Sequence, residues 1–490
     1  MLAKKEKQLE EFLNNVDDQI AYQPMHFAVN EELRAHIDDK AEMYMGLGLD
    51  EDTSYDKAIR DMGDAYVLGT QFNETHRLRN AKTMLILLIV LVILGLIRNI
   101  AADGIVGVWE SFYYVIGLGV LGVVFFRGYP ALLQYGEKIF KILFATMIFF
   151  VISLAIQRSW DMSMIIRTLH HLYSPSVLFG IYQLSPTILT VVLYRRRKKA
   201  WTSLGMILTY LAALILISRY AYVGEHIYVP FLTMLISTIF VTAYMIYKQY
   251  LNIDVKKGFV TLFIGMFCLI WMFCALQWND VYRNIQMFIN PHAQASVTSS
   301  WDDSYNNVLI RELLGRAELI GEIQLTKEEL IRYGTAQWYY EDGEGIWNGE
   351  TTSSRDFESE ISYRMQFLDN PEIEDVMPQH HQRNYRIAFW ILKYGWIPGF
   401  ILIGLILATQ IVIFWTSWKI HNNLGRVVAI AGCITLTGQN ICYILGNFGF
   451  QFGKFGNLPF VSEGLVSIVG TMIMAGLILS AYRFDMVIKE

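Results

Sequence analysis

The sequence predicts an all-α, polytopic membrane protein. Its residues are 54% hydrophobic and 14% aromatic but only 17% charged, and the mean hydropathy is +0.33. Ten apolar runs are long enough to cross a hydrocarbon core of about 30 Å at roughly 1.5 Å per residue. The first 80 residues and the segment 278–386 are polar by contrast. We therefore expect about ten transmembrane helices, a small N-terminal helical domain and one large loop.

The predicted spans follow the apolar runs in order. They are 83–101, 107–126, 139–157, 174–194, 202–219, 227–247, 258–277, 387–417, 427–446 and 461–482. The eighth run is longer than a single crossing requires, so it predicts tilt or an interfacial extension. The predicted domains are 1–80, 81–277 with spans one to seven, the loop 278–386, and 387–484 with spans eight to ten.

Basic residues predict the orientation. They gather in alternate loops, most clearly in the run Arg195–Lys199, and they also precede the first span at Arg79 and Lys82. By the positive-inside rule, both termini are cytoplasmic and the loop 278–386 is external. No apolar signal segment occurs in the first eighty residues. We expect a multi-pass protein of a cell membrane, in contact with bilayer lipids.

Cysteine usage gives no sign of a metal site. All four cysteines fall inside predicted spans, at Cys268, Cys274, Cys433 and Cys442. There they are expected to be small packing residues rather than disulfides or ligands. Neither a metal site nor a nucleic-acid partner is predicted, and the sequence identifies no cofactor.

The N-terminal 80 residues form a separate cytoplasmic unit. The expected helices cover 4–20, 30–46 and 53–73, with Asn30 and either Asp52 or Thr53 as N-caps and Gly46 and Gly48 as stops. The string EELRAHIDDKAEMYMGLGLDEDTSYDKAIRDMGDAYVLG resembles the permease-prefix domain of Gram-positive membrane proteins. That resemblance implies an interaction or regulatory module, and a solvated helical hairpin is the alternative.

The last two predicted spans are joined by Leu458-Pro459-Phe460-Val461-Ser462 within a Gly- and Asn-rich turn. This turn resembles the corresponding loop of the SEDS family, which includes the cell-wall polymerases FtsW, RodA and SpoVE. Gly425-Arg426, Gln439-Asn440 and Arg483 resemble the surrounding family pattern, as does Tyr282-Arg283 followed by Asn290-Pro291. The resemblance implies the SEDS fold, with ten spans and a large external loop between spans seven and eight.

The family resemblance also implies a reaction. SEDS proteins polymerise lipid II: a sugar hydroxyl attacks an anomeric carbon, and undecaprenyl pyrophosphate leaves. They work beside a class B penicillin-binding transpeptidase. The family's catalytic aspartate, counted back from Gly395, corresponds to Asn384 in HQRNYRIAFWILKYG, and Lys393 replaces a glutamate. An amide cannot take a proton at neutral pH, so Asn384 could orient a hydroxyl but not deprotonate it.

Other family positions differ as well. His380 and His381 precede Asn384, and a neutral imidazole with a pKa near roughly 6.5 could serve as the base. Exposed loop histidines without a role are the alternative. Ser174–Val177 lacks the family's glutamate, and Tyr222 stands where the family has an aspartate. Backbone-shaping residues are kept while ionisable ones are lost, which favours a retained fold with altered or lost chemistry.

Six residues are candidates for substrate binding: Arg283, Glu463, Ser462, Pro459, Glu225 and Asn440. Arg283 could pair with a pyrophosphate, or could simply snorkel to lipid headgroups. Glu463 is ionisable beside a Pro-Gly break. Glu225 and Asn440 lie in or at the edge of spans, where polar groups are expected to face the bundle interior. Interhelical hydrogen bonding is the alternative role for Asn440.

The sequence thus leaves three functional hypotheses. The first is a SEDS-type peptidoglycan glycosyltransferase of cell division, elongation or sporulation. The second is a non-catalytic homologue that acts as a scaffold or regulator, or that binds lipid II or another undecaprenyl-linked precursor. The third, a secondary transporter, is weaker because no paired halves with matching broken helices are visible.

Overall fold

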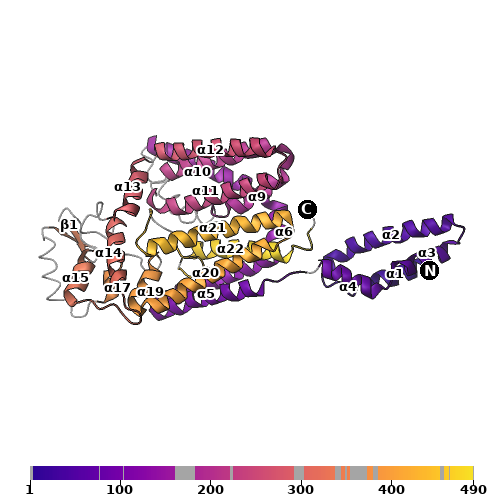
Figure 1. Ribbon diagram of the computed structural model, residues 1–490, viewed down its shortest axis with the longest axis horizontal. Coiled ribbons are helices and arrows are strands. Elements are labelled where there is room, and N and C mark those ends of the chain that lie inside the picture. The colour runs from indigo at the N-terminus through magenta and orange to yellow at the C-terminus, as the bar shows by residue number, and fades with distance from the viewer. Residues whose placement is uncertain are drawn as a thin grey trace. The chain divides into compact units, whose positions relative to one another are not determined.

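A computed structural model gives the fold (Figure 1). The structure describes residues 4–76, 78–102, 104–159, 182–220, 224–276, 278–291, 303–336, 344–347, 350–353, 372–378, 384–452, 457–462 and 464–488. The chain divides into two compact units. The first comprises Met1–Ala81, Ile420–Gly425 and Ala481–Glu490, and the second comprises Lys82–Lys419 and Arg426–Ser480.

Four helices build most of the first unit. They are α1 (Lys4–Asp17), α2 (His26–Gly46), α3 (Glu51–Met62) and α4 (Ala65–His76), with the 3₁₀ turn η1 (Gln23–Met25) before α2. One face of α2 is buried, at Val29, Leu33, Ile37, Ala41 and Tyr44. These positions are spaced three or four residues apart, as expected for a helix that lays one stripe against its neighbours. The helices therefore enclose a hydrophobic core of their own.

The helix boundaries in this unit differ from the predicted ones. Asn30 lies inside α2 rather than capping it. The N-cap of α3 is Asp50, whose carboxylate accepts from the Thr53 N–H at 3.2 Å. The helix expected over 53–73 is broken at Gly63, where φ is 91°, so two helices form instead. Gly46 ends α2 as predicted.

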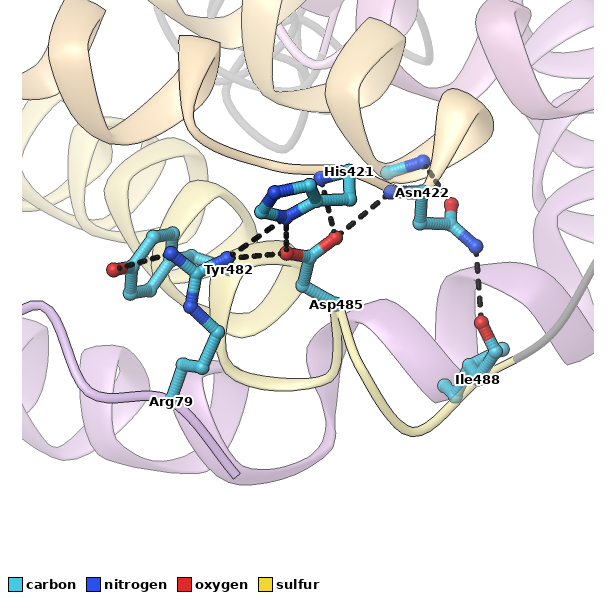
Figure 2. A network of polar contacts seen from close by, with 7 residues as sticks. Arg79, His421, Asn422, Tyr482, Asp485 and Ile488 are labelled. Carbon is cyan, nitrogen blue, oxygen red and sulfur yellow. Dashed lines mark hydrogen bonds and ion pairs between the residues drawn. The ribbon is translucent and has the colours of Figure 1, made fainter. Parts of the chain in front are cut away.

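The rest of the first unit is held by the buried carboxylate of Asp485 (Figure 2). It accepts from the backbone N–H groups of His421 at 2.6 Å and Asn422 at 2.8 Å. It also lies 3.0 Å from the His421 Nδ1 atom and forms an ion pair with Arg79. The Arg79 guanidinium lies over the Tyr482 ring, 4.2 Å from its centroid. Three segments far apart in sequence are thus joined through one carboxylate.

The second unit consists mainly of apolar helices that run side by side (Figure 1). They are α5 (Lys82–Ala102), α6 (Gly104–Ser159), α9 (Ser185–Arg195), α10 (Ala200–Tyr220), α11 (Gly224–Tyr247), α12 (Val255–Leu276), α20 (Trp396–Trp418), α21 (Asn423–Asn447) and α22 (Leu465–Arg483). Within the described residues, six helices are long and apolar enough to cross a membrane. The protein is therefore a helical, polytopic membrane protein, and the number of ten spans stays a prediction.

The predicted second and third spans form one continuous helix, α6. It contains Pro130, and its apolar stretch Ser111–Phe149 is 39 residues long. Before Pro130 the helix packs on α22, and after it the helix packs on α9 and α10. Proline removes a backbone donor and bends a helix. A single crossing needs about 20 residues, so this apolar stretch is longer than one crossing requires, and its division into two spans stays a prediction.

The predicted eighth span, 387–417, is not continuous. It is divided into α19 (Arg386–Tyr394) and α20 at Gly395, where φ is 98°. A side chain there would meet the Ile320 Cα and the Leu319 carbonyl oxygen, both at 2.6 Å. The Trp396 N–H donates to the Glu318 carbonyl at 2.9 Å, so the passing chain takes over hydrogen bonds at the break. The long apolar run therefore comprises two helices, of which α20 alone is long enough to cross a membrane.

The segment between α12 and α19 is partly helical. It contains α13 (Trp278–Ile289), α14 (Asp303–Arg316), α15 (Lys327–Ala336), the strands β1 (Glu344–Trp347) and β2 (Glu350–Ser353), and α17 (Ile373–Val376). The two short strands form an antiparallel hairpin in which Glu344 pairs with Ser353. These helices gather at one end of the apolar bundle (Figure 1).

Candidate functional site

The first turn of α19 is anchored by the buried amide of Asn447, at the end of α21. Its Oδ1 atom accepts from the N–H groups of Ile387 at 2.9 Å and Ala388 at 3.0 Å. Its Nδ2 atom donates to the carbonyl oxygens of Asn384 and Tyr443, both at 2.9 Å. A helix N-terminus leaves its first N–H groups without intrahelical acceptors. Asn447 provides the missing acceptor for two of them from another helix.

A buried arginine lies beside this amide. Arg386 is 1% exposed, and its guanidinium donates to the Val461 carbonyl. Its backbone N–H donates to the Tyr443 hydroxyl at 3.2 Å. The Tyr114 hydroxyl of α6 donates to the same Val461 carbonyl at 2.6 Å. Charged side chains are seldom this buried, because desolvation costs several kcal/mol unless hydrogen bonds offset it.

The turn that receives these bonds is Leu458–Ser462. The Ser462 Oγ atom accepts from the Leu458 N–H at 2.8 Å, and the Ser462 N–H donates to the Leu458 carbonyl at 3.0 Å. Phe460 has φ of 67°, a conformation that non-glycine residues rarely adopt. Pro459 and Ser462 are both buried. Both therefore shape this turn, and Ser462 uses its hydroxyl within it.

We define the outer cluster as Asn384, Tyr385, Arg386, Tyr443, Asn447 and the turn Leu458–Ser462. Asn384 is half-buried at its edge. The Tyr385 hydroxyl extends the cluster by donating to the buried Gln451 Oε1 atom at 2.8 Å. Among the described residues, the groups in this cluster are amides, hydroxyls and one guanidinium, with no carboxylate. Such groups can bind an anion or orient a hydroxyl, but they do not supply a general base.

The remaining candidate site residues lie away from this cluster or outside the described residues. Asn440 is two turns before Asn447 on α21, and its Nδ2 atom donates to Gln410 Oε1 on α20 at 3.0 Å. This is an interhelical hydrogen bond, the alternative role expected for it. Arg283 is exposed on α13. His381 and Glu463 lie outside the described residues, and Glu225 lies on α11 with its side chain outside them.

Arg311 of α14 joins the polar segment to the outer cluster's edge. Its Nε atom donates to the Gly449 carbonyl at 2.8 Å, and its Nη2 atom donates to the Phe288 carbonyl of α13 at 3.3 Å. The guanidinium also lies over the Phe450 ring, 4.1 Å from its centroid. Burial lowers the pKa of Arg311 from its usual value. This arginine thus fixes α13, which carries Arg283, against the turn that follows α21.

Lys393, which stands where the family has a glutamate, forms an ion pair on α19. Its Nζ atom lies 2.8 Å from the Glu374 Oε1 atom of α17. The hydrogen bond to Glu374 raises the pKa of Lys393. A carboxylate from the polar segment thus neutralises the positive charge of Lys393 on α19.

Sequence reasoning did not single out Arg386, Asn447, Tyr443 or Tyr114. One signal was present for Arg386, because it is the only charge in the run YRIAFWIL, 385–392. An isolated charge inside an apolar run is usually buried with polar partners. No comparable signal marks Tyr114 or Asn447, whose partners are remote in sequence.

The sequence matches no family model and no curated protein. A solved structure that resembles this chain is described as "Structural coordination of polymerization and crosslinking by a peptidoglycan synthase complex". The likeness covers 82% of this chain and 97% of that chain, at 13% sequence identity and a TM-score of 0.49. Values this low establish neither a shared fold nor a shared function.

Proposed function

We propose that this protein is a SEDS-like component of bacterial cell-wall synthesis that binds a polyprenyl-linked glycan precursor, such as lipid II, at the outer cluster. One observation carries the proposal. The Asn384 segment, which aligns with the family's catalytic position, meets the SEDS-like turn Leu458–Ser462 through Arg386 and Val461, which are 75 residues apart in sequence. The position that the resemblance assigns to catalysis thus lies beside the turn that motivated the resemblance.

The charge of the outer cluster supports binding of an anionic precursor. A pyrophosphate carries negative charge, and arginine is the side chain best suited to it because its planar fork donates several hydrogen bonds. Arg386 places a positive charge within the cluster, and Arg283 is exposed on α13, which Arg311 ties to the neighbouring turn. In this proposal Arg386 acts by its field and by holding the turn, while the exposed Arg283 makes the direct contact with the pyrophosphate.

Polymerisation of lipid II is the second candidate function, and the position of Asn384 is the observation that favours it. The residue lies at the edge of the cluster, where the family resemblance places its catalytic carboxylate. Its amide cannot accept the hydroxyl proton, so we expect wild-type polymerisation to be weak or absent. Asn384→Asp supplies a carboxylate at the same position with nearly the same shape.

The test combines binding and turnover of fluorescent lipid II by the purified full-length protein in nanodiscs. We expect wild-type binding that Arg283→Gln weakens, with little glycan product. Asn384→Asp should raise product formation, since general-base assistance contributes roughly 10² to 10⁴-fold. Strong wild-type polymerisation unaffected by Asn384→Ala would show that the site is misplaced. Absence of lipid II binding in wild type would overturn the proposal itself.

The proposal extends to topology and partners. We place both termini in the cytoplasm and the segment 278–386 outside, and we expect a class B penicillin-binding transpeptidase as partner. In a variant without the four native cysteines, an impermeant thiol reagent applied to sealed cells should label Gly345→Cys and miss Glu31→Cys. The opposite pattern would reverse the orientation.

The N-terminal helices have a proposed role of their own, as a separable interaction module. They lie on the opposite side of the membrane from lipid II chemistry in the predicted topology. Deleting 1–75 while keeping Arg79 and Lys82 should leave insertion and lipid II binding unchanged, because the flanking cations still orient the first span. Localisation or partner association should change instead. Reversed insertion of the truncated protein would contradict this role.

A further inference from the structure

A cavity of about 260 Å³ lies between α6, α9 and α10. Its walls are mainly apolar, formed by Phe140, Phe144, Ala145, Ile148, Val192 and Met206. Phe140 and Phe144 stack with their ring centroids 6.1 Å apart, and Phe140 also packs on Tyr210 at 5.5 Å. Ala145 and Ile148 are exposed, so the cavity opens on the side of the bundle.

One end of the cavity is charged. Glu137, Lys141 and Arg196 complete its lining. The Arg196 Nε atom lies 3.2 Å from the Glu137 Oε1 atom, and both side chains are about one-third exposed, at 39% and 34%. The lining thus carries one net positive charge, and the exposed residues Lys198 and Lys199 follow Arg196 in the chain.

We propose that this cavity binds an anionic phospholipid, with the headgroup phosphate at Lys141 and Arg196 and one acyl chain along the Phe140 and Phe144 wall. The combination of a basic mouth with apolar walls is complementary to such a lipid and to few soluble molecules. Basic pockets between transmembrane helices are suited to anionic headgroups on the cytoplasmic side. The run Arg195–Lys199 predicts that this mouth faces that side.

The size of the cavity limits what it holds. Small-molecule sites usually enclose roughly 300–1,000 Å³, so this cavity accommodates one end of a lipid rather than a whole one. The exposed Ala145 and Ile148 leave the rest of the lipid in the bilayer. Glu137 competes with the phosphate for Arg196, so the ion pair between them lowers the affinity of the cavity for the lipid.

The experiment is native mass spectrometry of the delipidated full-length protein in detergent, titrated with dioleoyl-phosphatidylglycerol or dioleoyl-phosphatidylcholine. We expect preferential binding of the anionic lipid. Lys141→Met should weaken it about fivefold, the equivalent of about 1 kcal/mol per basic residue. Lys198→Met removes the same charge nearby but outside the lining, and should change the affinity less than about twofold.

Two further variants separate the proposal from general electrostatics. Glu137→Gln frees Arg196, so the affinity for phosphatidylglycerol should rise, by up to about fivefold if the exposed pair contributes at most about 1 kcal/mol. Ala145→Phe fills the cavity and should abolish the preference, whereas Ala275→Phe, an exposed alanine of α12, should not. Equal effects of Lys141→Met and Lys198→Met would overturn the proposal. So would binding of inorganic phosphate or glycerol phosphate as tight as that of the lipid.

Discussion

The two polar clusters of this protein bury opposite charges in different ways. Asp485 in the first unit pairs with Arg79 and accepts from the backbone of the 420–425 segment. Arg386 in the second unit donates to a main-chain carbonyl, within a shell of hydroxyls and amides. The first arrangement joins three segments through an ion pair. The second holds a positive charge next to the SEDS-like turn Leu458–Ser462, as the proposed binding of an anion requires.

The difference teaches that a buried charge is not by itself evidence of function. Ionisable groups within membrane proteins are functional candidates by default, yet the ion pair and hydrogen bonds of Asp485 explain its burial by a structural role. For Arg386, the proposed function rests on the neighbouring segments around Asn384 and Leu458–Ser462. The comparison therefore predicts that changes at Asp485 affect stability alone, and that changes at Arg386 affect ligand binding as well as stability.

The largest expected effect is that of Asp485→Ala. Removing one partner of a buried ion pair leaves the other charge uncompensated and costs roughly 3–5 kcal/mol. The backbone N–H groups of His421 and Asn422 also lose their acceptor. Thermal and SDS unfolding of the purified protein should show the loss, and limited proteolysis should reach the C-terminal residues sooner.

Arg79→Met is the partner control for this prediction. The double variant should cost less than the sum of the two single variants, because each change removes the same pair. Lipid II binding per folded molecule should stay unchanged in all three variants. If any of these variants lost lipid II binding without losing stability, the Asp485 cluster would have a binding role too, and the two clusters would not differ in function.

Arg386→Met should have the next largest effect on stability. A hydrogen bond to a charged group contributes roughly 1.5–3 kcal/mol, but the Val461 carbonyl keeps the Tyr114 hydroxyl as a donor. Lipid II binding should fall by about tenfold, which corresponds to about 1.4 kcal/mol. Arg386→Lys keeps the charge without the fork and should retain part of the binding. Unchanged binding in both variants would make Arg386 a structural group like Asp485.

Asn447→Ala tests how the outer cluster positions Asn384. The change removes the acceptor for the Ile387 and Ala388 N–H groups, and losing such a capping side chain costs roughly 0.5–2 kcal/mol. Hydrogen exchange at the start of α19 should become faster, while exchange in α20 should not. If both helices exchanged faster together, the break at Gly395 would not isolate them.

Much of this fold could be predicted from the sequence, because long apolar runs can only be satisfied as helices within a bilayer. The break between α19 and α20 could not, since Lys393 is the only charge between Ile387 and Trp418 and glycine is tolerated within such helices. What makes Gly395 a break is the chain at Leu319 and Ile320, which arrives from the polar segment. The Asn384 region and the Leu458–Ser462 turn were predicted as site elements. The residues that join them depend on contacts between remote segments.

The smallest expected effect is the loss of the partly exposed Arg316–Glu329 ion pair, which measures how much such a pair contributes to stability. Arg316 and Glu329 connect α14 to α15 with their Nη1 and Oε1 atoms 2.9 Å apart, at partly exposed positions. The hydrogen bond from Arg316 lowers the pKa of Glu329 to about 2. Because the folded-state pKa lies below the usual value of 4.5, the pair contributes its stability fully above that pH. The contribution should fade as the pH drops from about 4.5 toward 2. Unfolding measured across this range should show a slope that Arg316→Gln flattens. An equal slope in the Arg316→Gln variant would mean that other carboxylates carry the acid sensitivity.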